Sequence, residues 1–182
     1  MKTFNIIKTG YLILCLITIY TLFSLSNEQD EYFFEVDNTE HNIPDSPTSI
    51  MLYELIEVYS DHYNIPRYIA YNIAFKETGY LGPFHWRYNP RRESCAGAVG
   101  AMQVMPSTCN YINKRHYSKK MLRDDLKLNL ITSMKLLNRL HKKYSSWTIV
   151  CGCYNTGKPI INDYARYCSS HKNYKDKWLK FD

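Results

Sequence analysis

The sequence lacks the features that mark several classes of protein. No low-complexity repeat appears in its 182 residues, and hydrophobic residues make up 45%, so a folded domain is expected rather than a disordered or fibrous chain. No CxxC pair is present, because Cys151 and Cys153 are only two positions apart, and we expect neither a metal site nor a cofactor. Past residue 27 the number of cysteines is odd, so at least one is unpaired. We expect small buried residues, with one disulfide as an alternative, at Cys95, Cys109, Cys151, Cys153 and Cys168.

Charge is absent from residues 9–27, and only Lys2 and Lys8 precede this stretch. Its apolar centre is typical of a secretory signal, while its uncharged length is close to the ~20 residues that span a bilayer. Residues 1–26 are therefore expected to be either a signal peptide or a membrane anchor. In both cases the rest of the chain is exported to the periplasm or cell envelope, and any contact with the inner membrane is through this segment.

Lysine and arginine are absent from the next segment, residues 27–48, which holds seven acidic residues and two prolines. This composition predicts a solvated acidic linker. Residues 49–182 then keep 21 of the 23 basic residues and 10 of the 17 acidic ones, a net charge of 21 − 10 = +11. A basic exported domain suits nucleic acid, anionic lipid or an anionic wall polymer as its partner.

No stretch alternates convincingly between polar and apolar residues, and the periodicity is helical almost throughout. We therefore predict a mainly α fold, with a single domain over residues 49–170 and a charged tail over 171–182. Proline at the first helical position, after Ser46, is expected to start the first helix. The buried face of that helix is predicted to carry Met51, Leu55, Val58 and His62.

Three helices are expected in the C-terminal half. Asp124 or Asp125 is predicted to cap a long helix, and residues 147–155 form a short apolar helix that Gly157 halts. A last helix is expected over about residues 160–170.

Glu77 interrupts an apolar helical stripe. Ile69, Ile73 and Glu77 recur every four residues, and Gly79 ends the helix just beyond them. A carboxyl group at the end of such a stripe is desolvated, and the negative end of the helix dipole acts in the same direction, so its pKa is expected to rise. A carboxyl that stays protonated near neutral pH can protonate a leaving oxygen. The alternative is an ordinary boundary glutamate paired with an arginine.

Small and polar residues recur every three positions in the segment SCAGAVGAMQVMP. Ser94, Gly97, Gly100 and Gln103 carry this pattern. Glycines at such spacing let a backbone approach a ligand closely, with side-chain donors at each end. Taken alone, the same pattern also suits a tight turn with a buried glutamine.

Three sequence blocks together resemble the soluble lytic transglycosylase family, whose members have a lysozyme-like fold. The blocks are residues 73–80 (IAFKETGY), residues 94–106 and residues 154–157 (YNTG), in the family's order. Asp125 and Asn129 match the family's D-P-x-x-N helix start, although leucine replaces the proline. The resemblance covers about residues 50–168 and implies a peptidoglycan-cleaving enzyme with a single lysozyme-like domain.

The resemblance also implies a role for each matching residue. Glu77 would protonate the glycosidic oxygen between N-acetylmuramic acid and N-acetylglucosamine, and would then act as a base. Tyr154 would orient Glu77 and the substrate's acetamido group, while Asn155 would hold the helix end beside them. The remaining implied substrate contacts are Ser94, Gln103 and Met105.

Few acids accompany Glu77. Before Tyr154 the only others are Glu93, Asp124 and Asp125, and the aspartates read as a helix cap. Glycoside hydrolysis normally needs a second carboxylate. Without one, the substrate's N-acetyl group can stabilise the sugar cation and its C6 hydroxyl can close a 1,6-anhydro ring. A muramidase that uses Glu93 as its second carboxylate is the alternative.

The segment between Glu77 and Ser94 is several residues longer than in the family, and it leaves two readings open. It can form one wall of the substrate groove, or it can pack Trp86 on the domain without touching substrate. Residues 80–92 combine aromatic rings that suit sugar faces with basic groups that suit carboxylates. These residues are Phe84, Trp86, Tyr88, Arg87, Arg91 and Arg92.

Peptidoglycan explains the net charge of +11, because wall peptides and muramic acid carry carboxylates. Nucleic acid is not expected as a partner, since no basic run interleaves with aromatic residues on one helix face. A non-catalytic wall-binding component of a secretion or conjugation complex is a further alternative. The joint presence of Glu77, Gln103 and Tyr154 argues against it.

Overall fold

The computed structural model describes residues 47–171 of the chain. The predicted signal or anchor (1–26), nearly all of the linker (27–48) and nearly all of the tail (171–182) lie outside the described residues. Within the described part, no helix has both the length and the apolar character needed to cross a bilayer.

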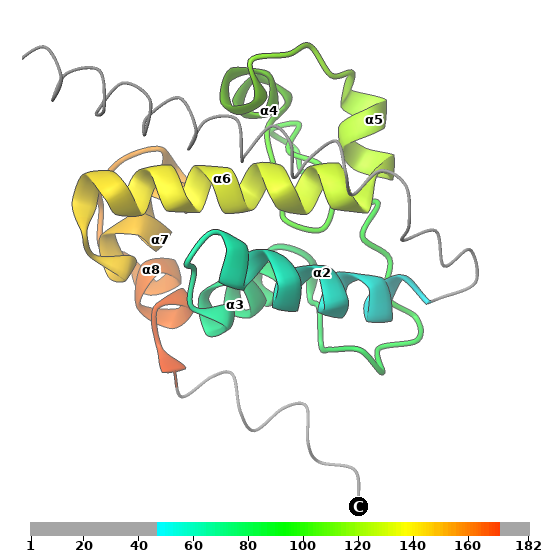
Figure 1. The fold of residues 1–182 in the computed structure, drawn as a ribbon, viewed down its shortest axis with the longest axis horizontal. Coiled ribbons are helices and arrows are strands. Elements are labelled where there is room, and N and C mark those ends of the chain that lie inside the picture. Colours follow the sequence, from blue (N-terminus) through cyan, green and yellow to red (C-terminus); the bar gives the residue numbers. More distant parts are fainter. Residues whose placement is uncertain (1–46, 172–182) are drawn as a thin grey trace, which may run out of the picture. The chain divides into compact units, whose positions relative to one another are not determined.

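Helices dominate the described residues, as predicted for a mainly α fold. Figure 1 shows α6 running across the domain, with α4 and α5 on one side of it, α2 and α3 on the other, and α7 and α8 near its end. Between residues 47 and 171 the only β pairing consists of isolated bridges. In chain order the helices are α2 (Thr48–His62), α3 (Arg67–Thr78), α4 (Pro106–Asn113), α5 (Lys119–Asp124), α6 (Leu126–Tyr144), α7 (Trp147–Thr156) and α8 (Asp163–Cys168).

Several predicted helix ends are confirmed. Gly79 and Gly157 end α3 and α7 in the left-handed conformation, with φ of 70° and 71°, which glycine adopts without steric cost. Asp125 caps α6, because its carboxylate accepts the Leu128 N–H at 2.9 Å. Asp124 instead ends the preceding helix, α5.

The predicted buried face of α2 is wrong by one residue. Val58, assigned to the core, is 49% exposed, and Met51, Leu55 and His62 are only half-buried. The helix also begins at Thr48, one residue later than predicted, with Pro47 as its N-cap. A second set at the same spacing, rotated by one position, carries larger apolar groups and packs inward. This set is Leu52, Ile56, Tyr59 and Tyr63.

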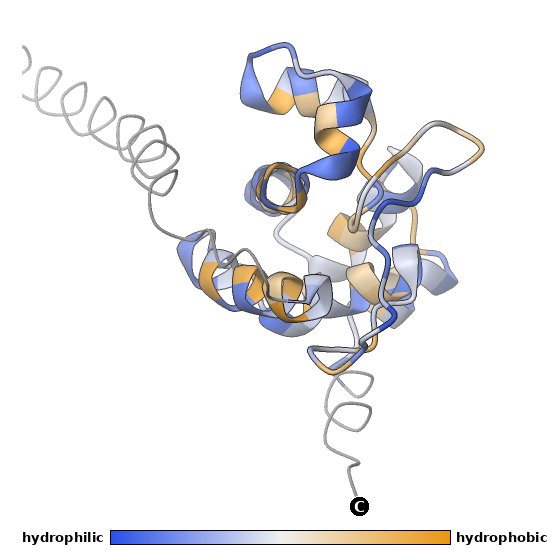
Figure 2. Ribbon diagram, turned by 90° about the vertical axis from the view of Figure 1, so that its right-hand side faces the viewer, coloured by the Kyte–Doolittle hydropathy of each residue, from blue (hydrophilic) through white to orange (hydrophobic). Residues whose placement is uncertain are grey.

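Two short helices, α4 and α5, were not predicted. Pro106 is the first residue of α4, a position where its missing N–H does no harm. Ser118 caps α5 by accepting the Met121 N–H at 3.2 Å. The last helix, α8, is shorter than predicted, because the Asn162 side chain starts it only at Asp163. Figure 2, turned by 90°, shows hydrophobic and hydrophilic residues alternating along the helices of the described part.

Candidate active site

Glu77 lies in the last turn of α3, on the same side as the fully buried Ile69 and Ile73. Its side chain is half-buried. Burial raises the pKa of the Glu77 carboxyl, although a hydrogen bond from Tyr164 and the charge of Lys76 partly oppose the shift. Among residues 47–171 no arginine pairs with Glu77, so the ordinary ion-paired glutamate is not what the fold contains.

Tyr164 holds the Glu77 carboxylate. Its hydroxyl donates to Oε1 of Glu77 at 2.5 Å, across 87 positions of sequence. Burial, and then the Glu77 charge, raise the pKa of Tyr164 well above its ordinary value, so the phenol keeps the proton that it donates. Sequence reasoning missed this residue. The sequence offered one signal, the spacing of four residues between Tyr164 and Cys168, which places both on one face of the last helix. The structure shows that Cys168 is completely buried, so this face points inward.

The segment that follows the long loop folds back on itself. Val99 bridges both Glu93 and Val104, and it exchanges two hydrogen bonds of 3.0 Å with Val104. Ser94 closes the turn, because its Oγ accepts the Ala98 N–H at 3.0 Å. The Ser94 hydroxyl was predicted to contact sugars; in the structure its oxygen already has this structural partner.

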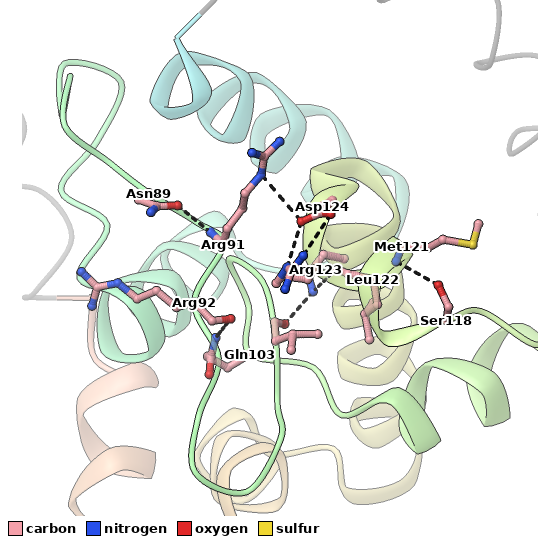
Figure 3. Close-up of polar contacts among 11 residues, drawn as sticks. Asn89, Arg91, Arg92, Gln103, Ser118, Met121, Leu122, Arg123 and Asp124 are labelled. Atoms are coloured by element: carbon pink, nitrogen blue, oxygen red, sulfur yellow. Dashed lines mark hydrogen bonds and ion pairs between the residues drawn. The ribbon is translucent and has the colours of Figure 1, made fainter.

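Gln103 ties the two ends of this turn together (Figure 3). Its Nε2 donates to the carbonyl oxygens of Gly100 at 2.9 Å and Arg92 at 3.2 Å. The backbone of Gln103 has a φ of 47°, an unusual value for a residue other than glycine. Because its amide hydrogens are engaged, the group that Gln103 can offer a sugar is Oε1, which can accept a hydroxyl hydrogen.

Asn129 of α6 holds the turn through side-chain hydrogen bonds. Its Nδ2 donates to the carbonyls of Val99 at 2.8 Å and Leu122 at 3.1 Å, and its Oδ1 accepts the Met102 N–H at 2.9 Å. Gly100 lies directly against it, since a Cβ on Gly100 would be 2.2 Å from Nδ2 of Asn129. The missing side chain of Gly100 therefore makes room for the protein's own asparagine, whereas the sequence pattern suggested room for a ligand.

Tyr154 does not hydrogen-bond Glu77, contrary to the role that the resemblance implied. Its hydroxyl donates to the carbonyl oxygen of Met102 at 2.7 Å and lies 2.9 Å from the Ser133 hydroxyl. The hydrogen bond to the carboxylate comes from Tyr164 instead. Tyr154 is nevertheless near Glu77, because the Glu77 charge adds to burial in raising the pKa of Tyr154. It connects the turn to α6 and α7.

The two remaining predicted site residues lie at helix ends. Met105 is the N-cap residue of α4, and its side chain is exposed. Asn155, in the last turn of α7, accepts a hydrogen bond of 3.0 Å from Asn162, the N-cap of α8. Asn155 thus joins the two helices whose packing places Tyr164.

Comparison with known proteins assigns this arrangement to a family. Residues 54–177 match the model of the transglycosylase SLT domain, which covers most of the chain and all of the site described above. The chain belongs to the SLT transglycosylase family. Among curated proteins, none matches the sequence significantly.

Two solved structures share the fold. The 70 kDa soluble lytic transglycosylase from Escherichia coli superposes with a TM-score of 0.50 and 24% identity over 63% of this chain. A complex of the 70-kDa soluble lytic transglycosylase with bulgecin A gives the same values. The inactive-mutant lytic transglycosylase Slt from Pseudomonas aeruginosa matches more loosely, with a TM-score of 0.49 and 14% identity over 80% of this chain. This chain covers only 18%, 18% and 27% of those three chains, respectively.

The acids between Glu77 and Tyr154 in this SLT domain are engaged away from Glu77. Glu93 forms an ion pair with Lys119. Asp124 pairs with Arg123 at 2.9 Å and with Arg91 at 3.7 Å (Figure 3). The hydrogen bond from Arg123 lowers the pKa of Asp124, so this carboxylate stays ionised. With Asp125 capping α6, each acid between Glu77 and Tyr154 already has a partner.

The long loop of this SLT domain exposes Phe84 and Trp86 but buries Tyr88. Trp86 is 64% exposed and packs edge-on against Phe84, with ring centroids 5.8 Å apart. This exposure contradicts the reading in which Trp86 packs on the domain. The loop is fastened instead at Pro83, whose carbonyl accepts the Ser49 hydroxyl at 2.8 Å.

The five cysteines of the described part are all unpaired, four of them buried and Cys95 exposed. A hydrogen bond with Cys151 and burial raise the pKa of Cys168 far above its ordinary value, so this thiol stays protonated. Within residues 47–171 no group of three or more histidine, cysteine or acidic side chains is arranged to hold a metal.

Proposed function

We propose that the chain is a peptidoglycan lytic transglycosylase that cleaves the β-1,4 bond between N-acetylmuramic acid and N-acetylglucosamine without consuming water. The observation that carries this proposal is the half-buried Glu77 carboxyl, with its raised pKa and its hydrogen bond from Tyr164, in a domain of the SLT family. Glu77 acts first as the acid on the glycosidic oxygen and then as the base that removes the C6 hydroxyl proton.

The partners of Glu77 support a reaction without a second carboxylate. Tyr164 holds the ionised form after proton transfer, and burial favours the protonated form before it. Glu93 is neutralised by Lys119 on an exposed part of the turn. The substrate's acetamido group then stabilises the sugar cation, and the C6 hydroxyl closes the anhydro ring. Gln103 and Met105 contact the sugars, with Ser94 holding the turn on which they lie.

The substrate places the enzyme in the cell envelope, where peptidoglycan lies. Export then depends on residues 1–26, as a signal peptide or an inner-membrane anchor, and the enzyme opens the wall for turnover or for a secretion or conjugation complex. The basic domain, with a net charge of +11, favours contact with wall carboxylates.

The first prediction concerns the products. Digestion of purified peptidoglycan is expected to yield 1,6-anhydromuramyl ends, because the C6 hydroxyl, not water, attacks C1. Mass spectrometry of the released muropeptides separates the outcomes, since a hydrolysed product is heavier by one water. Reducing muramic acid as the main product would establish the muramidase and make Glu93 the second carboxylate. The variant Glu93→Gln then distinguishes the mechanisms, because it leaves the transglycosylase active.

The second prediction concerns the long loop. Replacing both Arg91 and Arg92 with alanine is expected to weaken binding to insoluble peptidoglycan several-fold and to reduce its dependence on salt, because two exposed charges near the substrate are lost. The backbone carbonyl of Arg92, which accepts from Gln103, remains. Binding is measured by sedimentation at several salt concentrations, and the rate on bound substrate by single turnover.

Lys142 and Lys143 provide a matched control for charge. They lie in the last turn of α6, at the opposite end of that helix from α5 (Figure 1). Replacing both with alanine removes the same net charge but is expected to change binding less. Equal losses in the two double variants would mean that wall binding follows overall charge, and that the loop does not line the groove.

A further inference from the structure

The hydroxyl of Thr78, the residue after Glu77, has three oxygen neighbours. Its Oγ1 lies 3.0 Å from the carbonyl oxygen of Ala74, 2.9 Å from that of Ala101 and 2.8 Å from the hydroxyl of Tyr88. Thr78 is 1% exposed and Tyr88 7%. Three segments therefore meet at one buried oxygen: the end of α3, the turn that carries Gln103, and the long loop.

Proton counting decides the direction of the bond between Thr78 and Tyr88. A threonine hydroxyl has one hydrogen, and the carbonyls of Ala74 and Ala101 can only accept. If Thr78 donated to Tyr88, both carbonyl oxygens would face Oγ1 with no hydrogen between them, so Thr78 donates to a carbonyl and Tyr88 donates to Oγ1 of Thr78. Burial raises the pKa of Tyr88, so its phenol keeps this hydrogen at all ordinary pH values. Without the Tyr88 hydroxyl, the buried Thr78 oxygen loses the donor that completes its bonding.

Tyr88 is itself fixed by the loop that carries it. Its ring packs against Tyr80 with centroids 4.8 Å apart and against His85 at 5.5 Å. The Tyr80 hydroxyl donates to the carbonyl of Ser49 at 2.6 Å, which attaches the start of the loop to α2. Tyr88 is thus a held side chain that reaches from the loop into the junction behind Glu77.

We infer that Tyr88 is a positioning residue for the reaction of Glu77. It acts through Thr78: by donating to that hydroxyl it fixes the last turn of α3 against Ala101, and thereby sets the position of the Glu77 carboxyl relative to the turn that holds substrate. The neighbouring Met102 carbonyl accepts from Tyr154, so the same backbone is fixed from two sides. This inference rests on the proposed function, and it gives the long loop a second task besides wall binding.

The test compares two buried tyrosines of the full-length chain. Tyr88→Phe removes the hydroxyl that contacts Thr78, and Tyr80→Phe removes one that contacts α2. Both are expected to lower the melting temperature by a few degrees. Only Tyr88→Phe is expected to lower kcat on soluble glycan strands, by about tenfold with KM within about twofold, because a misplaced acid slows the chemical step without weakening binding.

Two further measurements separate positioning from general loosening. Thr78→Val removes the acceptor, and combining it with Tyr88→Phe is expected to lower kcat no further than Thr78→Val alone, because both act through one contact. In carbon NMR titrations the Glu77 carboxyl of Tyr88→Phe is expected to ionise about half a pH unit lower than in the wild type, as its burial loosens. In Tyr80→Phe the Glu77 carboxyl is expected to ionise at the same pH as in the wild type.

The inference is overturned if Tyr88→Phe matches Tyr80→Phe in both kcat and the Glu77 titration, or if the effects of Thr78→Val and Tyr88→Phe multiply. Failure of the proposed function has a different signature. A wild type that cleaves no glycan refutes the transglycosylase, while the titration still shows whether Tyr88 sets the environment of the Glu77 carboxyl.

Discussion

Replacing Glu77 with glutamine is expected to lower the rate of glycan cleavage by about a thousandfold or more while the protein stays folded. Glutamine keeps the shape of the side chain and can still accept the hydrogen bond from Tyr164, but it has no acidic proton for the glycosidic oxygen. The rate is measured as release of soluble muropeptides from purified peptidoglycan. A loss of less than about tenfold, roughly 1.4 kcal/mol of barrier, would show that Glu77 is not the acid.

Glu54→Gln is the matched control, because it makes the same chemical change on the exposed side of α2 and should leave the rate unchanged. Stability supplies a second check on Glu77. Burial raises its pKa in the folded state, so ionisation opposes folding. The wild type should therefore match Glu77→Gln in stability below the ordinary glutamate pKa, and should become the less stable of the two as pH rises through the raised value.

The environment of Glu77 could be predicted because it depends on local periodicity. Ile73 and Ile69 lie about one and two turns before it, and Gly79 ends the helix, so the sequence alone predicts a carboxyl at the edge of the core. The same kind of reasoning found α6, whose cap Asp125 and buried face are both local features. The mainly α fold and the family follow from such signals together with three short motifs.

The partner of Glu77 could not be predicted, because it comes from tertiary packing. Tyr164 and Tyr154 are both tyrosines near the end of the chain, and only the docking of α8 on α3 decides which hydroxyl reaches the carboxylate. The predicted buried face of α2 was wrong for a related reason. Two sets of residues have the same helical spacing, and the choice between them depends on what lies opposite, which the local sequence does not contain.

The contacts of Asn129 also come from tertiary packing, although the sequence did single out this residue. The family motif marks it as part of a helix start. Its side chain, however, hydrogen-bonds the turn at Val99 and Met102, some thirty positions earlier in the chain. Because this amide is engaged on both its nitrogen and its oxygen, it cannot move without leaving buried backbone groups unpaired. The turn that bears Gln103 is consequently built on a rigid contact.

Replacing Gly100 with alanine is expected to destabilise the fold by about 3–4 kcal/mol, one of the largest single effects in the domain. The new Cβ would lie 2.2 Å from Nδ2 and 2.5 Å from Cγ of Asn129, far inside contact distance. Relief requires Asn129 to give up its bonds to Val99, Leu122 and Met102, all of which are buried. Denaturant unfolding of the variant and the wild type measures the difference.

Gly97→Ala isolates the clash from backbone strain. Gly97 lies in the same turn with a φ of 87°, close to the 82° of Gly100, so alanine at either position has a similar conformational cost of about 1 kcal/mol. A Cβ at Gly97, however, would meet nothing nearer than the Lys119 Nζ at 4.0 Å. Equal destabilisation by the two substitutions would mean that Asn129 moves aside at little cost. The turn that carries Gln103 would then not be held rigidly by Asn129. A loss at Gly100 that exceeds the loss at Gly97 by about 2 kcal/mol or more would instead measure the rigidity that Asn129 gives this wall of the site.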